Sequence, residues 1–138
     1  MRVRKARPED VPAAVDLART LGLDYPGLEA DPLWVAEAEG RIIGLVALKR
    51  HPDCFELCAL GVDPGSRGKG VARALVEALM NEAPGDVHLA TLSPDFFESC
   101  GFHIIEEEVP ATFPAKRETD WCGGCPRERC TVMLGKKP

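Results

Sequence analysis

The sequence predicts an α+β fold with a mixed, mostly antiparallel sheet flanked by helices. Extended apolar runs alternate with segments of helical periodicity, and several of the runs are joined by short turns. No internal repeat interrupts this order. At 138 residues, 45% of them hydrophobic and 28% charged, the chain fits one soluble globular domain over 1–138. Within that domain, 110–138 is expected to be a tail rich in proline, glycine and cysteine.

The N-terminal part predicts a strand followed by a helix. Residues 3–6 fit a first strand. Residues 7–22 fit a helix, because acidic residues occupy its first turn and Gly22 follows its end. The next stretch, 23–32, is rich in turn-forming residues, and we expect it to be irregular.

A meander of strands is expected next. The stretch 33–50 predicts two strands joined by a hairpin turn at Glu39-Gly40. After a second turn, which contains His51, residues 54–62 predict the third strand of the meander. We expect His51 to be a plain surface residue. Glu56 is a single carboxylate within the otherwise apolar third strand.

The second half begins with a helix that starts at Val71. Apolar residues recur at i, i+3, i+4, i+7 and i+8 from that position, and Pro84-Gly85 ends the element. The remaining elements are expected in the following order: a strand over 87–92, a short helix over 93–102, a strand over 103–109 and a last strand over 131–135.

The junction between the third meander strand and this helix is a basic, glycine-dense turn. Pro64 breaks the strand, and Arg67-Gly68-Lys69-Gly70 then surrounds the N-terminus of the helix. Unpaired N–H groups and the positive end of the helix dipole make such a terminus an anion site. The spacing fits neither the Walker phosphate loop nor the dinucleotide fingerprint. What remains is the pattern Arg67-x-x-Gly70-x-Ala72.

At this junction the sequence resembles the GNAT superfamily of acetyl-CoA-dependent N-acetyltransferases, whose pyrophosphate signature is Q/R-x-x-G-x-G/A. The resemblance covers nearly all of the chain. RKARPEDVPAAVDLA resembles the opening strand and helix, WVAEAEGRIIGLVAL the second and third strands, and FFESCGF the short helix and ending after the fifth strand. It implies the GNAT acyl-CoA N-acyltransferase fold, with a sheet splayed between strands four and five.

The resemblance further implies that acetyl-CoA is the cosubstrate, and it indicates the residues that bind it. Leu60, Gly61 and Val62 would present backbone groups to pantetheine in the gap between the splayed strands. The pyrophosphate would lie against Arg67, Gly68, Lys69, Gly70, Val71 and Ala72. Gly70 and Ala72 keep this backbone bare, so that successive amides can approach the phosphates.

Glu56 is the candidate catalytic base. It resembles the strand-four glutamate with which many family members take a proton from the amine, often through water. The alternative is an outward-facing residue, because a buried carboxylate is costly without a function. The N–H of Leu60 or Gly61 would polarise the thioester oxygen. Many members protonate the leaving thiolate with a tyrosine, but Phe97 stands there and the only tyrosine is Tyr25, so the acid is absent or comes from elsewhere.

The tail stretch DWCGGCPRERCTVML resembles the tail of short GNAT proteins related to N-acetylglutamate synthases. This resemblance implies an α-amino acid as the acetyl acceptor. The stretch 22–32 departs from those proteins, because it is short, acidic and turn-like where they carry a longer basic helical segment. Other small amines and protein N-termini therefore stay candidates.

The cysteines of the tail suggest a structural zinc site. Cys122 and Cys125 have the C-x-x-C spacing that lets two thiolates bind one ion, and Cys130 follows as a third ligand. Cys100 or His103 would have to supply the fourth. Reduced thiols, or a Cys122–Cys125 disulfide, are the alternatives.

The composition limits the kinds of partner that we expect for this protein. A formal charge of −5 gives no general attraction to nucleic acid or acidic membranes, and no apolar run is long enough for a signal peptide or a membrane span. A cytoplasmic location is the default expectation, with a small-molecule amine as partner and a homodimer left open. The function expected is N-acetyl transfer to a primary amine by direct attack in a ternary complex. The alternative is a non-catalytic acyl-CoA sensor or interaction module.

Overall fold

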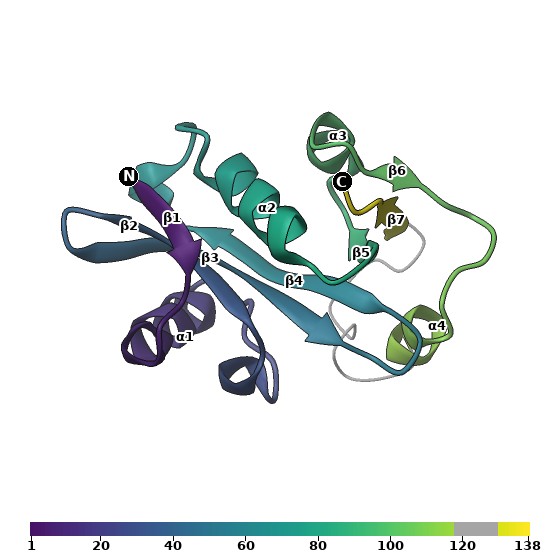
Figure 1. Ribbon diagram of the computed structural model, residues 1–138, viewed down its shortest axis with the longest axis horizontal. Helices are drawn as coiled ribbons and strands as arrows, with labels where there is room; N and C mark the ends of the chain where they lie inside the picture. Colours follow the sequence, from purple (N-terminus) through teal and green to yellow (C-terminus); the bar gives the residue numbers. More distant parts are fainter. Residues whose placement is uncertain (118–129) are drawn as a thin grey trace.

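The computed structural model describes residues 1–117 and 130–138, with the backbone alone for 115–117. In this part of the chain, seven strands form one mixed sheet in the order β1-β2-β3-β4-β5-β7-β6 (Figure 1). The strands are β1 (Arg2–Lys5), β2 (Leu33–Ala38), β3 (Arg41–Arg50), β4 (Phe55–Val62), β5 (Val87–Thr91), β6 (His103–Ile104) and β7 (Thr131–Gly135). The helices are α1 (Val11–Thr20), α2 (Val71–Glu82), α3 (Pro94–Ser99) and α4 (Thr112–Arg117), with 3-10 turns at Pro8–Asp10, Leu28–Ala30 and Pro64–Ser66.

Helices α1 and α2 cover opposite faces of the sheet (Figure 1). The alternation of side chains along β2 and β3 explains this arrangement, because successive residues of a strand point to opposite faces. Trp34 and Val46 pack in the core cluster of α2, whereas Val35 and Leu45 pack in the cluster of α1. The centre of the sheet is therefore buried on both sides.

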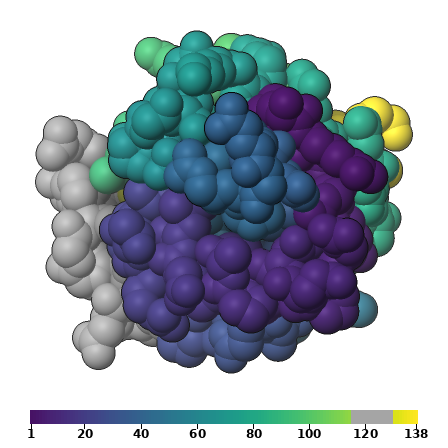
Figure 2. Space-filling view, turned by 90° about the vertical axis from the view of Figure 1, so that its left-hand side faces the viewer, coloured from purple at the N-terminus to yellow at the C-terminus, as the bar shows by residue number. Residues whose placement is uncertain are grey.

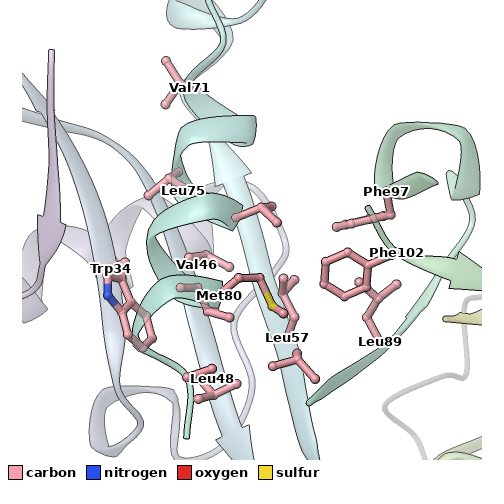
Figure 3. Close-up of a cluster of buried hydrophobic side chains, with 14 of the residues drawn as sticks. Trp34, Val46, Leu48, Leu57, Val71, Leu75, Met80, Leu89, Phe97 and Phe102 are labelled. Carbon is pink, nitrogen blue, oxygen red and sulfur yellow. The ribbon is translucent and has the colours of Figure 1, made fainter. Parts of the chain in front are cut away.

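The larger core cluster lies between α2 and the sheet and continues to α3 (Figure 3). Leu75 and Met80 of α2 belong to it together with Leu57 of β4. The rings of Phe97 and Phe102 meet edge to face with their centroids 5.8 Å apart. Both rings are buried, so these aromatic residues anchor α3 to the core.

The turn between β2 and β3 is the hairpin predicted at Glu39-Gly40. Glu39 has a φ of 53° and Gly40 a φ of 73°. A two-residue loop with positive φ at both positions matches the twist of the strands that it joins. Figure 2 shows this hairpin in blue beside the N-terminal strand and helix in purple.

The sheet opens between β4 and β5, as expected. These strands are parallel and pair at Phe55↔Val87 and Glu56↔His88, the start of each strand. Beyond this point β4 stays with β3 as far as Val62, whereas β5 stays with β7 as far as Thr91. The two halves of the sheet therefore separate on the C-terminal side of Glu56.

The region after α3 differs from the prediction in two ways. The strand expected over 103–109 is only His103–Ile104, because a run of glutamates follows and Glu108 turns away with a φ of 55°. Helix α4 was not predicted, and its Thr112 hydroxyl donates to the Asp53 carboxylate at 2.6 Å. The predicted last strand is present as β7, which inserts between β5 and β6.

Candidate active site

A cleft of about 1300 Å³ lies where β4 and β5 separate. Its lining in the described part of the chain comes from the segment after α1, from β4, from the turn into α2, from the end of β5 and from α3. The lining includes Glu56 and these predicted cosubstrate residues: Leu60, Gly61, Val62, Arg67, Gly68, Gly70, Val71 and Ala72. Lys69 is exposed and is not among the lining residues. One cavity thus joins the basic turn to the carboxylate.

The basic turn presents its backbone to open space. Gly68 and Gly70 both have a φ of +79°, a conformation in which glycine is strongly favoured. A Cβ atom built at either position would have no neighbour within 4 Å. The space in front of this backbone is therefore free to take a ligand, and a side chain at Gly70 would project into it.

The first turn of α2 adds donors to the same end of the cleft. Gly70 is the N-cap residue of α2, and no side chain caps this terminus. The first N–H of the helix with a backbone partner is that of Ala74, which donates to the Gly70 carbonyl at 3.1 Å. The N–H groups of the residues between them have no partner within the helix. No acidic residue lies in the first turn. Arg67 donates from Nε to the Val62 carbonyl at 3.1 Å, which holds its guanidinium beside the end of β4. This end of the cleft favours anions.

A bulge divides β4 beside the cleft. Cys58 pairs with Ala47 and Gly61 with Leu45, so that the two residues between Cys58 and Gly61 face one residue of β3. Ala59 has a φ of 54° there, well outside strand geometry. No feature of the sequence predicted this bulge. It turns the strand locally and takes its backbone out of regular pairing next to the point where the sheet opens.

Glu56 lies at the other end of the cleft and is 2% exposed. Its Oε1 lies 2.7 Å from Nε2 of His51. The prediction that His51 is a surface residue is wrong, since its side chain is 13% exposed. The β3–β4 turn accounts for this position, because the His51 N–H bonds to the Cys54 carbonyl and folds the turn back over β4. A buried carboxylate needs such partners.

Tyr25 enters the same cleft from the segment between α1 and β2. Its hydroxyl donates to Oδ2 of Asp31 at 2.6 Å, and Nζ of Lys49 lies 4.9 Å from its ring centre. Burial, and then the hydrogen bond to Asp31, raise the pKa of Tyr25 well above its usual range. The phenol therefore stays neutral. The irregular segment was predicted, but nothing in its pattern placed Tyr25 beside Glu56.

Phe97, at the position where the resemblance implies a tyrosine, is a core residue that also borders the cleft. It packs against Phe96 and Phe102 and carries no polar atom. The only hydroxyl-bearing ring of the sequence is that of Tyr25, which lines the same cleft from the segment between α1 and β2.

Two of the predicted zinc ligands, Cys122 and Cys125, lie outside the described residues. Cys130 directly precedes β7 and is half-buried. Among the residues that the structure describes, no group of three histidine, cysteine or carboxylate side chains is arranged to hold a metal. The zinc site stays a prediction, and metal analysis of protein purified without chelators tests it: less than about a tenth of an equivalent would exclude it.

The comparisons with known proteins agree with this geometry. The family model described as "Acetyltransferase (GNAT) domain" matches residues 29–104. The amino-acid acetyltransferase of Mycobacterium tuberculosis is 33% identical over 124 residues, which cover 75% of this chain and 69% of that protein. The chain belongs to the GNAT acetyltransferase family.

Two further comparisons concern a relative of which the match covers only part and a solved structure that contains ligands. N-acetylaspartate synthetase of Danio rerio is 34% identical over 92 residues, 59% of this chain, and the match spans only 33% of that protein. The solved structure of Rv2747 from Mycobacterium tuberculosis, in complex with CoA and NLQ, has a TM-score of 0.72 and 25% identity. That comparison covers 99% of each chain.

Proposed function

We propose that this protein transfers the acetyl group of acetyl-CoA to the primary amine of a small molecule, with amino acids the favoured class. The observation that carries the proposal is the shared cleft: a bare, cationic backbone turn at one end and a buried carboxylate, Glu56, at the other. A non-catalytic acyl-CoA sensor needs only the first of these. A carboxylate kept out of water at the far end favours a reaction.

The chemistry follows from the two ends. The diphosphate of acetyl-CoA binds the N–H groups of Gly68 to Ala72 and the Arg67 side chain, and pantetheine follows β4. The amine nitrogen attacks the thioester carbon, and Glu56 takes a proton from the amine. The nitrogen–carbon bond forms as the carbon–sulfur bond breaks. The thiol has a reference pKa of about 8.5, so the sulfur can leave as thiolate without a tyrosine and take its proton from water.

Backbone groups of β4 polarise the thioester oxygen in this proposal. The N–H of Leu60 or Gly61 is the donor, and the bulge at Ala59 supports this assignment because it releases local backbone from the β3 ladder. Donors fixed before the reaction stabilise a developing oxyanion without reorganisation.

The favoured acceptor class has support from the relatives. One is called an amino-acid acetyltransferase and another an N-acetylaspartate synthetase. Since the match covers only a third of N-acetylaspartate synthetase, the acceptor of this chain need not be the acceptor of that protein. No helix among the described residues is long and apolar enough to cross a membrane. The cytoplasmic location and the homodimer stay predictions from the sequence.

Release of free coenzyme A over a panel of amines tests the proposal. Chromatographic detection suits this chain, because its six cysteines would react with thiol reagents. We expect turnover with an amino acid or small amine, a rate that rises with pH, and a loss of about 10²-fold in Glu56→Gln with acetyl-CoA affinity unchanged. Glu39→Gln, in the exposed hairpin, is the matched control. Acetyl-CoA binding without turnover on any amine would favour the sensor instead.

A further inference from the structure

We propose that His51 is a positioning residue for the reaction: its Nε2–H donates to Glu56 and holds that carboxylate in place, aimed at the amine. The inference rests on the proposed role of Glu56 as base. His51 contacts neither substrate in this scheme, and it acts only through Glu56. Nothing in the sequence pattern connects the two residues, since His51 belongs to a turn and Glu56 to the strand that follows.

The first support is the geometry of the pair. Nε2 of His51 and Oε1 of Glu56 are 2.7 Å apart, a distance typical of a charge-assisted hydrogen bond. Glu56 is 2% exposed, where a carboxylate loses most of its hydration. In general, a hydrogen bond donated to a buried carboxylate stabilises its charged form, the form that can take a proton from an amine.

The second support is that the imidazole is held in place by backbone structure. The N–H of His51 donates to the Cys54 carbonyl at 2.9 Å, which closes the β3–β4 turn. Residues on both sides of the turn pair in register, with Lys49 opposite Glu56 and Arg50 opposite Phe55. The donor is thus attached to the same hairpin that carries the base, and its orientation does not depend on a flexible loop.

The third support is the electrostatic setting of His51. It lines a second cavity of about 440 Å³, with Arg50, Asp53, Cys54, Asp86 and His88 as its other titratable lining residues in the described part of the chain. Hydrogen bonds from Thr112 lower the pKa of Asp53, burial raises that of Cys54 to about 11, and burial lowers that of His88.

Because the pKa of Asp53 is lowered, its carboxylate is ionised near neutral pH. The raised pKa of Cys54 and the lowered pKa of His88 keep that thiol and that imidazole neutral. On the other side of the pair, Tyr25, which stays neutral, and Cys58 line the cleft with Glu56. Lys49 is the strand partner of Glu56, and its Nζ lies 3.8 Å from the Asp31 carboxylate. Nε2 carries its hydrogen in the imidazolium and in one neutral tautomer, so the donor role holds in both charge states.

The test uses two variants of similar size. His51→Leu removes the donor, whereas His51→Gln keeps a neutral N–H donor that cannot titrate. In His51→Leu we expect the acidic limb of the kcat/KM profile to move to higher pH by about one unit or more, with a loss of about tenfold below neutrality. In His51→Gln the profile returns close to that of the wild type. The melting-temperature shift caused by acetyl-CoA stays unchanged in both variants.

Opposite outcomes would overturn the inference. A uniform loss of kcat at every pH in His51→Leu would mean a purely structural role, and a displaced profile in both variants would exclude the N–H donor. If His51→Leu does not fold, His51→Ala assayed with and without added imidazole makes the same comparison between a missing and a restored donor. The nitrogen-detected imidazole spectrum of the wild type is independent of turnover: a hydrogen at Nε2 is expected, and a His51 protonated only at Nδ1 would refute the inference even if no amine were acetylated.

Discussion

The two ends of the cleft are built on different principles. The proposed cosubstrate end is one contiguous stretch, 67–72, which offers backbone N–H groups and the start of α2. The proposed acceptor end brings together Glu56 of β4, His51 of the preceding turn and Tyr25 of the α1–β2 segment. A backbone site needs only the right conformation and the absence of side chains. A site of buried side chains needs a partner for each polar group.

This difference predicts different sensitivities. At the cosubstrate end, added bulk or negative charge should abolish binding, whereas loss of one side chain should weaken it. At the acceptor end, loss of a single hydrogen bond should change acceptor kinetics and leave acetyl-CoA binding intact. The following variants test that division, from the largest expected effect to the smallest.

Gly70→Glu should reduce acetyl-CoA affinity by about 100-fold or more, because it places a side chain and a negative charge in front of the bare backbone. Thermal melting with and without acetyl-CoA measures the effect. A ligand at 100 times its Kd stabilises the wild type by about 2.7 kcal/mol, and the variant should show almost none of that gain.

Gly40→Glu is the control for backbone strain. Gly40 has a φ of +73° with no neighbour within 4 Å of its Cβ position, which matches Gly70, but it lies in the β2–β3 hairpin away from the cleft. Both variants should lose a similar roughly 1–2 kcal/mol from the left-handed conformation. An undiminished acetyl-CoA shift in Gly70→Glu would show that the turn does not hold the diphosphate.

Arg67→Ala should weaken acetyl-CoA binding by about tenfold, because one charge-assisted contact to the diphosphate is lost. The paired variant is Lys69→Ala, two residues along the same turn but outside the cleft lining. We expect it to change affinity by less than about twofold at moderate ionic strength. Titration calorimetry on both variants decides the point. Equal losses in the two would mean that the turn attracts anions by net charge rather than by the geometry of Arg67.

Tyr25→Phe should have the smallest effect. It removes the hydrogen bond to Asp31, and we expect the KM for the acceptor to rise by about fivefold, with acetyl-CoA affinity unchanged. Because burial and Asp31 raise the pKa of Tyr25, the phenol is neutral throughout the assay range, and the alkaline limb of the rate profile should not move. Steady-state kinetics over pH measures both. A large fall in kcat would instead identify Tyr25 as the acid that the sequence lacks at Phe97.

The sequence by itself determined the features that depend on neighbouring residues. Gly40 predicted the hairpin turn, because glycine readily adopts the positive φ found there. The apolar stripe that begins at Val71 predicted α2, because it recurs with the period of a helix. The turn that contains Gly70 was recognisable for the same reason, since it joins a strand to a helix within a few residues. Glu56 could be singled out because a lone carboxylate in an apolar strand has a large desolvation cost.

Only the tertiary structure decided what lies around Glu56. Tyr25 was expected in an irregular segment and came into the site through packing that no local period encodes. His51 was expected at the surface, and the fold of the β3–β4 turn brought it to Glu56. The bulge at Ala59 and the contact of Thr112 with Asp53 are of the same kind. Backbone conformation follows largely from adjacent residues, whereas the partners of a buried side chain are chosen by how distant segments fill the space around it.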